Sequence, residues 1–351
     1  MNTGSTSLKE VLMMNTFNIK GKHRIGFVLF AIFSTWFVLE SAQPHSCTIF
    51  TAVQGETVLF GDNWDYHEGD LIIGFFPPSK ENYGSIHFGY KKGEGQSYQR
   101  VVNDQGLAWA VNSIPRGKLT PHPEKAFSYM EDEFLYTITK KAATIEEVIQ
   151  FAGNYDFGDS MIAQIHIADA NGDAVVIGPG RDGEIVFTRK PAGDGYLLST
   201  NFNLAIPEKG PIDFRWDTAT SMLDTLSDSQ TLTPKFAGEI LKAVHLEMLT
   251  TYTLYSNVTD LKNGDIYIYY MSQYGEAVKL NIADELAKGQ RVIEARTLFP
   301  NKIAKEGDAS YHKFEIRFFA AITIVILTSL GLVGGGGVWI AKKLKQSKNK
   351  L

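Results

Sequence analysis

The chain has 351 residues, of which 44% are hydrophobic and 21% charged, which is enough material for one large domain or two small ones with a buried core. Its formal net charge of −5 argues against a nucleic-acid-binding protein, which normally concentrates basic residues on one surface. Cys47 is the only cysteine, so an internal disulfide is excluded and the thiol is either free or modified.

An apolar segment near the N-terminus predicts a leader that is removed. Residues 25–39 carry no charge and follow a cluster of basic residues between positions 20 and 24. A membrane span needs ~20 residues, so this segment is short for one but typical of a signal-peptide core. Small side chains at Ser41, Ala42 and Ser46 leave room for cleavage. We therefore expect residues 1–46 to be a signal peptide or propeptide.

A second apolar segment lies near the C-terminus. Residues 318–340 contain no charged side chain and are followed by lysines at several positions between 342 and 350. Length and flank predict a transmembrane helix with a basic cytoplasmic tail at 341–351. A buried helix of a water-soluble domain is the alternative, but four consecutive glycines would weaken it. The expectation is a single-pass membrane protein whose domain at 47–305 is extracytoplasmic and joined to the membrane by a juxtamembrane linker at 306–317.

The strand signals of the central domain come in pairs. Residues 47–53 and 57–65 are apolar runs separated by Gln54-Gly55-Glu56, which predicts a hairpin. A second hairpin is predicted over 161–178, with its turn at 169–173. That turn begins like a calcium-binding loop, but Ala174 and Gly180 stand where such a loop needs glycine and glutamate. A plain turn is the better interpretation. Residues 265–282 alternate like a third hairpin.

Helices are predicted in blocks between these strands. Residues 126–140, 217–226 and 234–248 have helical spacing of apolar side chains, and Thr144 with Glu147 forms a capping box that opens a helix to Ala152. Strands and helices in blocks, rather than in strict alternation, indicate an α+β layered domain of roughly 260 residues.

The position of Cys47 allows three interpretations. It can be a small buried hydrophobic residue, which is the usual role of a free cysteine. It can be lipid-modified, although the preceding Gln-Pro-His-Ser lacks a lipobox pattern. Finally, a cut between Ser46 and Cys47 would place a thiol and a free α-amine on one residue. The amine, with an ordinary pKa of ~7.7–8.0, would then accept the thiol proton, so nucleophile and base would arrive together.

An N-terminal nucleophile of this kind needs oxyanion donors, a group that orients the amine, and a nearby cation. Asparagine, aspartate and arginine at strand ends and turns are the expected residue types. Four stretches supply them, namely GDNWD (61–65), NDQGLAWAVN (103–112), STN (199–201) and DFRWD (213–217). Each stretch alone is equally consistent with an ordinary turn or a solvated surface residue.

The order and spacing of these stretches resemble the choloylglycine hydrolase family, which includes bile salt hydrolases and penicillin V acylases among the N-terminal-nucleophile hydrolases. The family begins its mature chain with Cys-Thr and continues with a Gly-x-Asn-x-Asp turn, an Asn-x-x-Gly-Leu segment, a Thr-Asn pair and an Arg-aromatic pair. The matching residues here are Cys47-Thr48, Gly61 to Asp65, Asn103 to Leu107 leading to Asn112, Thr200-Asn201 and Arg215-Trp216. The match covers residues 47–289.

The resemblance implies a four-layer αββα sandwich and an enzyme that hydrolyses linear C–N amide bonds without a metal or organic cofactor. By that resemblance Cys47 is the nucleophile, its α-amine is the base, and Asp65 orients the amine. Asn201 supplies one oxyanion donor, and Asn112 supplies another through its backbone N–H. Arg215 lies beside the nucleophile, where a fixed positive charge favours the thiolate.

Substrate binding is assigned to Asp62, Asn63, Trp64 and Trp109, with a small-molecule N-acyl amide as the partner. Bile salt hydrolases carry arginine at the position of Asp62, so their specificity is not carried over. The aromatic side chains form either an acyl pocket or plain core. An acyltransferase that uses the same acyl-enzyme is one alternative function. A catalytically inactive, membrane-anchored binding domain is another, and His166 is the next candidate if Cys47 is not the nucleophile.

Overall fold

The computed structural model describes residues 47–67, 69–127, 133–206, 213–227 and 230–348, with side chains described as far as Leu327 in the last helix. The predicted leader at 1–46 and the end of the basic tail therefore lie outside the described residues. The chain divides into two units, one formed by residues 44–315 and one that includes residues 316–351. The first unit contains all described β-strands and all candidate site residues.

The first sheet has six strands in the order β12-β1-β2-β13-β14-β15, and all neighbours are antiparallel. The strands are β1 (Thr48–Gln54), β2 (Thr57–Tyr66), β12 (Gly195–Ser199), β13 (Tyr252–Asp260), β14 (Asp265–Tyr270) and β15 (Gln273–Asn281). Strand β1 lies between β2 and β12, so the residue that precedes it is placed by two neighbours at once.

The second sheet has eight strands in the order β11-β10-β9-β6-β5-β4-β3-β16. The strands are β3 (Leu71–Phe76), β4 (Ser85–Lys92), β5 (Gly95–Asn103), β6 (Ala108–Lys118), β9 (Ser160–Ala168), β10 (Ala174–Pro179), β11 (Ile185–Lys190) and β16 (Arg291–Glu294). Strand β5 pairs with β6 only from Ala108 to Ala110. Among the described strands, β6 beyond Ala110 is therefore paired with β9 alone.

The helices and the remaining short elements complete the fold. They are α2 (Glu133–Lys141), α3 (Ile145–Ala152), α4 (Phe214–Leu223), α5 (Pro234–Ala243), α6 (Ile282–Leu286), α7 (Asn301–Lys348), the 3₁₀ turns η1 (Asp224–Ser227) and η2 (Ala295–Leu298), and the strand pair β7 (Ala126–Phe127) and β8 (Tyr155–Asp156).

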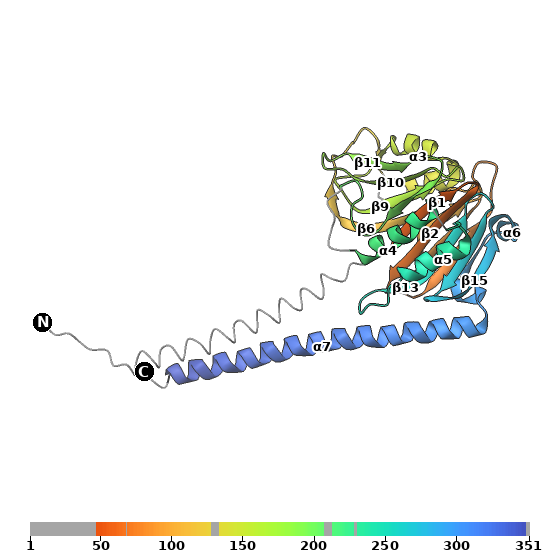
Figure 1. Ribbon diagram of the computed structural model, residues 1–351. Coiled ribbons are helices and arrows are strands. Elements are labelled where there is room, and N and C mark those ends of the chain that lie inside the picture. The colour runs from red at the N-terminus through yellow and green to blue at the C-terminus, as the bar shows by residue number, and fades with distance from the viewer. Residues whose placement is uncertain (1–46, 68, 128–132, 207–212, 228–229, 349–351) are drawn as a thin grey trace. The chain divides into compact units, whose positions relative to one another are not determined.

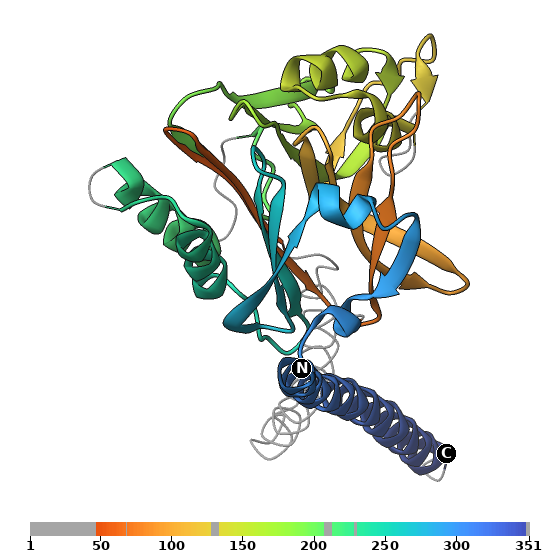
Figure 2. The same ribbon diagram turned by 90° about the vertical axis from the view of Figure 1, so that its right-hand side faces the viewer.

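Two hydrophobic cores and one interface between the sheets define four layers. Helices α4 and α5 cover one face of the six-stranded sheet, with Ile240 packed in the same cluster as Phe50. Helices α2 and α3 cover the outer face of the eight-stranded sheet, and Trp109 lies in that cluster. The inner faces meet where the ring of Phe60 contacts His166 edge-on at 5.6 Å. The predicted αββα sandwich is confirmed, and Figure 2 shows its layers edge-on.

The strand and capping predictions agree with the structure. All three predicted hairpins form, as β1–β2, β9–β10 and β14–β15. The turn at 169–173 is closed by backbone bonds from Asp169 N to Asp173 O and from Gly172 N to Asp169 O. The capping box of Thr144 and Glu147 is present at the start of α3, which ends at Ala152 as expected.

Three predicted helices have different bounds, and local hydrogen bonds explain the differences. Residues 126–127 pair with β8 as strand β7, so α2 begins only at Glu133. Helix α4 starts earlier than expected because Asp213 caps it by accepting from Arg215 N at 3.1 Å. Helix α5 ends at Ala243 rather than Met248, since Leu246 N donates instead to Thr253 Oγ1 at 2.7 Å.

The turn between β5 and β6 requires glycine at position 106. Gly106 has φ +79°, and a Cβ there would lie 2.3 Å from the carbonyl oxygen of Leu261. Asn103 Oδ1 closes the turn by accepting from the backbone N–H of Leu107 at 2.9 Å. The Asn-x-x-Gly-Leu motif is thus a structural device that sets the start of β6 and, through it, the position of Asn112.

Replacing Gly106 with alanine is expected to lower the free energy of unfolding by about 2–4 kcal/mol, because left-handed strain adds to a backbone clash. Gly93 is a matched control, since it also has positive φ (+59°) but no atom lies within 4 Å of its added Cβ. Gly93→Ala is expected to cost only about 1 kcal/mol. Denaturant unfolding measures both, and equal losses would contradict the role of the Leu261 contact.

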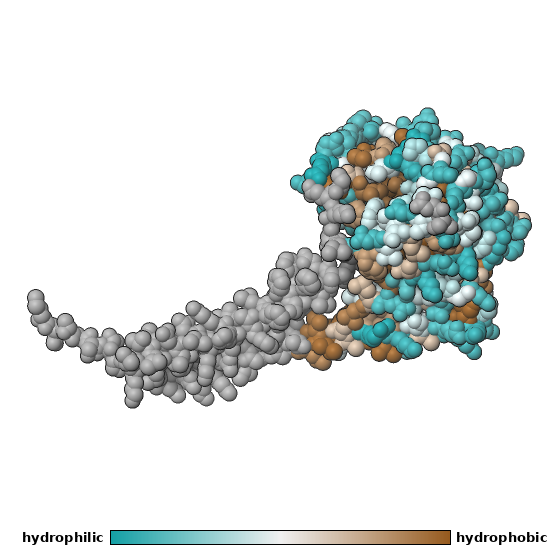
Figure 3. Space-filling view, in the orientation of Figure 1, coloured by the Kyte–Doolittle hydropathy of each residue, from teal (hydrophilic) through white to brown (hydrophobic). Residues whose placement is uncertain are grey.

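Helix α7 begins within the first unit and continues far beyond it in sequence (Figure 1). Ala304 and Phe314 are buried, and Tyr311 Oη donates to the carbonyl oxygen of His67 at 2.6 Å. Residues 306–317, expected to be a linker, are part of this helix. From Ile316 to Leu327 most large apolar side chains are exposed, and brown residues mark the end of the described side chains in Figure 3.

The predicted transmembrane helix at 318–340, and with it the predicted membrane localisation, is wrong. In the part of the chain that the structure describes, no helix is long and apolar enough to cross a membrane. The apolar segment is the continuation of a 48-residue helix that begins at Asn301 with a charged and polar stretch.

Candidate active site

The strand register brings the separated motifs to Cys47. Thr48 pairs with Asn63 across β1 and β2, so Cys47, one residue earlier, lies opposite Trp64. Ile49 pairs with Ser199 on the other side, so Cys47, two residues earlier, lies opposite Asn201. Cys47 is only 1% exposed. The GDNWD and STN stretches therefore reach one end of β1 because the register of the six-stranded sheet requires it.

Alternation along β2 divides its side chains between two faces of the sheet. Phe60, Asp62 and Trp64 share the face toward the second sheet, because Phe60 contacts His166 there. Asn63 and Asp65 share the face toward the helices, where Asn63 Nδ2 donates to the carbonyl oxygen of Leu241 at 2.8 Å. Asp62 and Asp65, three residues apart, thus lie on opposite faces of the sheet that contains β1.

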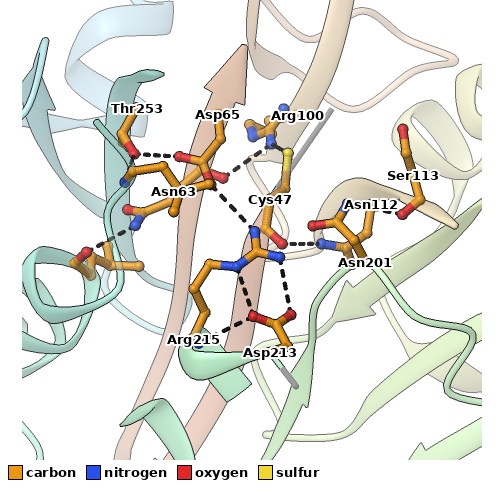
Figure 4. A network of polar contacts seen from close by, with 12 residues as sticks. Cys47, Asn63, Asp65, Arg100, Asn112, Ser113, Asn201, Asp213, Arg215 and Thr253 are labelled. Atoms are coloured by element: carbon orange, nitrogen blue, oxygen red, sulfur yellow. Dashed lines mark hydrogen bonds and ion pairs between the residues drawn. The ribbon is translucent and has the colours of Figure 1, made fainter. Parts of the chain in front are cut away.

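A buried ion pair lies at the thiol on the face between the sheets. Nη2 of Arg100, from β5, donates to Cys47 Sγ at 2.8 Å and to the carbonyl oxygen of Asn63 at 3.4 Å. Nε of the same guanidinium donates to Asp62 Oδ1. The side chains of Arg100 and Asp62 are each 3% exposed. Figure 4 shows Arg100 beside the sulfur.

A second charged group lies on the helix face. Arg215, at the start of α4, forms a bidentate pair with Asp213 at 2.9 and 3.0 Å. Its Nη1 lies 3.7 Å from Asp65 Oδ2, and Thr253 Oγ1 donates to the other oxygen of Asp65. Asp65 is fully buried. Arg215 and Thr253 thus hold the carboxylate from two elements.

Asn112 is placed by a buried chain of hydrogen bonds that leads back to His166. Asn112 Nδ2 donates to the carbonyl oxygen of Cys47 at 2.9 Å, while Ser199 Oγ donates to Asn112 Oδ1 at 2.7 Å. His166 Nδ1 bonds Ser199 Oγ at 2.8 Å, and its Nε2 bonds Thr51 Oγ1 at 3.0 Å. Burial lowers the pKa of His166 to about 3, so the ring is neutral. A hydrogen-bond chain through Ser199 and Asn112 thus connects His166 to the carbonyl oxygen of Cys47.

Asn201 follows β12 and is held by the second sheet. Its Nδ2 donates to the carbonyl oxygen of Ser113 at 2.9 Å. Gln164 Nε2 fixes the surrounding backbone by donating to the carbonyl oxygens of Thr200 and Phe202, each at 2.9 Å. Asn112 and Asn201 therefore reach Cys47 from β6 and from the end of β12.

Burial opposes ionisation throughout this site. Desolvation raises the pKa of the Cys47 thiol; Arg100 opposes that increase, and the Asp65 charge adds to it. Desolvation also raises the pKa of Asp65 to about 7, against the stabilising effects of Arg215 and Thr253. A new cation close to Asp65 would favour its ionised form. The α-amine that a cut before Cys47 releases is such a group.

The predicted site residues are not all in one place. Cys47, Asp65, Asn112, Asn201 and Arg215 converge at the end of β1 (Figure 4). Of the predicted substrate-binding residues, Asp62 contacts Arg100, Asn63 contacts the backbone of α5, and Trp64 is fully buried. Trp109 lies elsewhere: its neighbour Ala110 faces the inner side with His166, so the indole faces α2 and donates to Thr139 Oγ1 at 2.8 Å.

Arg100 is the site residue that sequence reasoning missed. It stands in a largely polar strand, three residues before Asn103 and outside every matched motif. The available signal was indirect, because an acidic residue at position 62 beside a predicted nucleophile requires a compensating cation.

In the part of the chain that the structure describes, no group of three or more histidine, cysteine or acidic side chains is arranged to hold a metal ion.

The four layers, with Cys47 at the head of a strand that has neighbours on both sides, define an αββα sandwich. Solved structures with this fold are similar to the chain. A variant of conjugated bile acid hydrolase from Clostridium perfringens, with arginine replaced by leucine, matches with a TM-score of 0.54 at 14% identity, over 70% of this chain and 96% of the hydrolase. A cysteine-to-alanine mutant of that hydrolase gives a TM-score of 0.53 at 14% identity, over 71% and 95%.

Penicillin V acylase from Agrobacterium tumefaciens matches with a TM-score of 0.54 at 15% identity, over 70% of this chain and 90% of the acylase. No protein-family model matches the sequence, and no curated protein matches it. At these identities the similarity establishes the fold alone. The fold expected from the resemblance to choloylglycine hydrolases and penicillin V acylases is confirmed.

Proposed function

We propose that the protein is a cysteine amidohydrolase that cleaves linear C–N amide bonds of small N-acyl compounds. The carrying observation is the placement of Cys47 at the head of β1, with Asn112 Nδ2 2.9 Å from its carbonyl oxygen and Arg100 Nη2 2.8 Å from its sulfur. The shared fold with a bile acid hydrolase and a penicillin V acylase supports the same reaction class. Removal of residues 1–46 would make Cys47 the N-terminal residue.

The reaction proceeds in two halves. The α-amine of Cys47 takes the thiol proton, and Sγ attacks the acyl carbonyl carbon, so an S–C bond forms and the carbonyl electron pair moves to oxygen. Collapse of this oxyanion breaks the C–N bond, while the ammonium returns its proton to the leaving amine. Water, deprotonated by the same amine, then attacks the thioester and releases the carboxylic acid and the thiol.

The surrounding residues have separate roles in this proposal. Asn201 Nδ2 and Asn112 donate to the oxyanion, where hydrogen-bond donors stabilise developing charge. Asp65 orients the α-amine, and Arg215 and Thr253 hold Asp65 for that task. Asn112 also fixes the Cys47 carbonyl oxygen, and Ser199 fixes the Asn112 amide.

The N-terminus of purified active protein tests the proposal. Intact mass and N-terminal sequencing are expected to find Cys47 first, and a panel of N-acyl amides is expected to release amine and carboxylic acid in equal amounts. Active material that begins at any other residue would contradict the mechanism. Adding a second amine during turnover separates the functions, because an acyltransferase would form a new amide in place of the acid.

A further inference from the structure

Cys47 has arginines on two sides, and only one of them contacts the sulfur. Arg215 is bound to Asp213 by two hydrogen bonds and its third nitrogen lies 3.7 Å from Asp65. Arg100 donates directly to Cys47 Sγ at 2.8 Å. Charge-assisted hydrogen bonds are stronger than neutral ones, and a guanidinium keeps its charge when it is buried. The contact that favours a thiolate is therefore made by Arg100.

Arg100 reaches the thiol because its side chain lies on the face of the second sheet that packs against the first sheet. It pairs with Ala110 across β5 and β6, and Ala110 pairs with His166, so the three side chains share the inner face. The guanidinium lies 5.2 Å from the ring centroid of Trp64 and 6.0 Å from that of Tyr255. These aromatic faces, together with Asp62, hold the cation in one position.

The Arg100–Asp62 pair is poorly explained as a stabilising device. Both side chains are almost fully buried, and burying an ion pair costs desolvation energy that the attraction often does not recover. Desolvation raises the pKa of Asp62, and Arg100 opposes that increase. One nitrogen of the cation is directed at the only thiol of the chain. The pair thus has a geometry suited to charge control at Cys47.

We infer that Arg100, held by Asp62, is a further catalytic residue whose guanidinium stabilises the Cys47 thiolate, while Arg215 serves the Asp65 side of the site. As a step in hydrolysis, this assignment rests on the proposed function. It also explains the departure at Asp62: where bile salt hydrolases place arginine on this strand, the present chain places the counterion and brings the arginine from β5.

The charged and titratable groups around the thiol come from four elements. Asp62 and Asp65 are on β2, Arg100 is on β5, Arg215 is on α4, and Tyr255 is on β13. Since Arg100 makes the direct contact, its loss is expected to raise the pH at which the thiol ionises. Cys47 is the only cysteine, so the ultraviolet absorbance of the thiolate, taken as a difference from the Cys47→Ser protein, reports this one group.

The test compares four proteins by thiolate titration and by the pH profile of kcat/KM. The neutral pair Asp62→Asn/Arg100→Gln avoids leaving one buried charge unpaired. It is expected to raise the titration midpoint by at least about one pH unit, which is tenfold less thiolate at a fixed pH. Arg100→Lys keeps the charge and is expected to shift less. The exchanged pair Asp62→Arg/Arg100→Asp is expected to recover part of the wild-type midpoint.

A second arginine–aspartate pair supplies the matched control. Arg189 on β11 bonds Asp173, and neither contacts the site. Arg189→Gln with Asp173→Asn is expected to leave the thiol midpoint unchanged. An unchanged midpoint in the Asp62/Arg100 neutral pair, or an equal shift in the control pair, would overturn the inference. If the wild-type protein hydrolyses no amide but the midpoint shifts as expected, the proposed function fails while the contact of Arg100 with the thiolate stands.

Discussion

Replacing Cys47 with alanine is expected to reduce amide hydrolysis by at least about 10³-fold, because the variant lacks the thiol that forms the proposed acyl-enzyme. Cys47→Ser is expected to be nearly as inactive, since a hydroxyl keeps its proton at a pH where a thiol beside Arg100 loses it. The measurement is release of amine from an N-acyl substrate by protein whose fold is checked by circular dichroism.

Val53→Ala provides the control for loss of bulk from the same strand. Val53 is buried at the far end of β1, about 20 Å along the strand from Cys47. Its variant is expected to be less stable but to keep its activity per folded molecule. Substantial turnover in Cys47→Ala would move the chemistry to another residue. The mass of that variant also shows how the leader is removed, because self-cleavage by the thiol would leave the chain uncut.

The fold was predictable wherever local signals and layer packing agree. The hairpin around Gly55 follows from two apolar runs and a turn, and the capping box of Thr144 fixed the start of α3 from side-chain chemistry alone. The end of α5 was not predictable, because Thr253, remote in sequence, competes for the backbone of Leu246. Tertiary hydrogen bonds of this kind override helical periodicity, and no local sequence pattern indicates them.

The candidate site was likewise predictable from the sequence only in part. Asp65 and Asn201 could be placed from motifs because the register of β1 with β2 and β12 carries them to Cys47. Arg100 could not be placed from a motif, because its contact with Cys47 depends on how the second sheet packs on the first. Trp109 belonged to a matched stretch, yet strand alternation turns it toward α2. Sequence spacing gives neighbours within one sheet, but it does not give contacts between sheets.

Asp65→Asn is expected to lower kcat/KM by about 10²-fold or more and, at the same time, to stabilise the full-length chain at alkaline pH. The loss of activity follows from its proposed role, because an amide orients an ammonium less well than a carboxylate does. The gain in stability follows from burial, which raises the pKa of Asp65 from 3.8 to about 7. The carboxylate is thus a cost to folding whenever it is ionised.

The direction of the pH dependence follows from proton binding in the two states. Between pH 3.8 and about 7 the folded chain keeps a proton on Asp65 that the unfolded chain has released, so stability falls as the pH rises through this window. The fall at this site amounts to a few kcal/mol, on the order of one 1.36 kcal/mol step per pKa unit. The asparagine variant has no proton to lose at this position. Its gain in free energy of unfolding over wild type should therefore be small near pH 3.8 and largest above about pH 7.

Denaturant unfolding of both proteins at the two ends of this window measures the difference. An equal effect of the substitution at both pH values would show that Asp65 does not titrate in the folded chain and would remove the basis of the prediction. Cleavage before Cys47 changes the result in a defined direction, because the released α-ammonium favours the ionised carboxylate and lowers its pKa. The mature wild-type chain should therefore lose less stability across the same window than the uncut chain, which links the cost of burying Asp65 to the amine that it is proposed to orient.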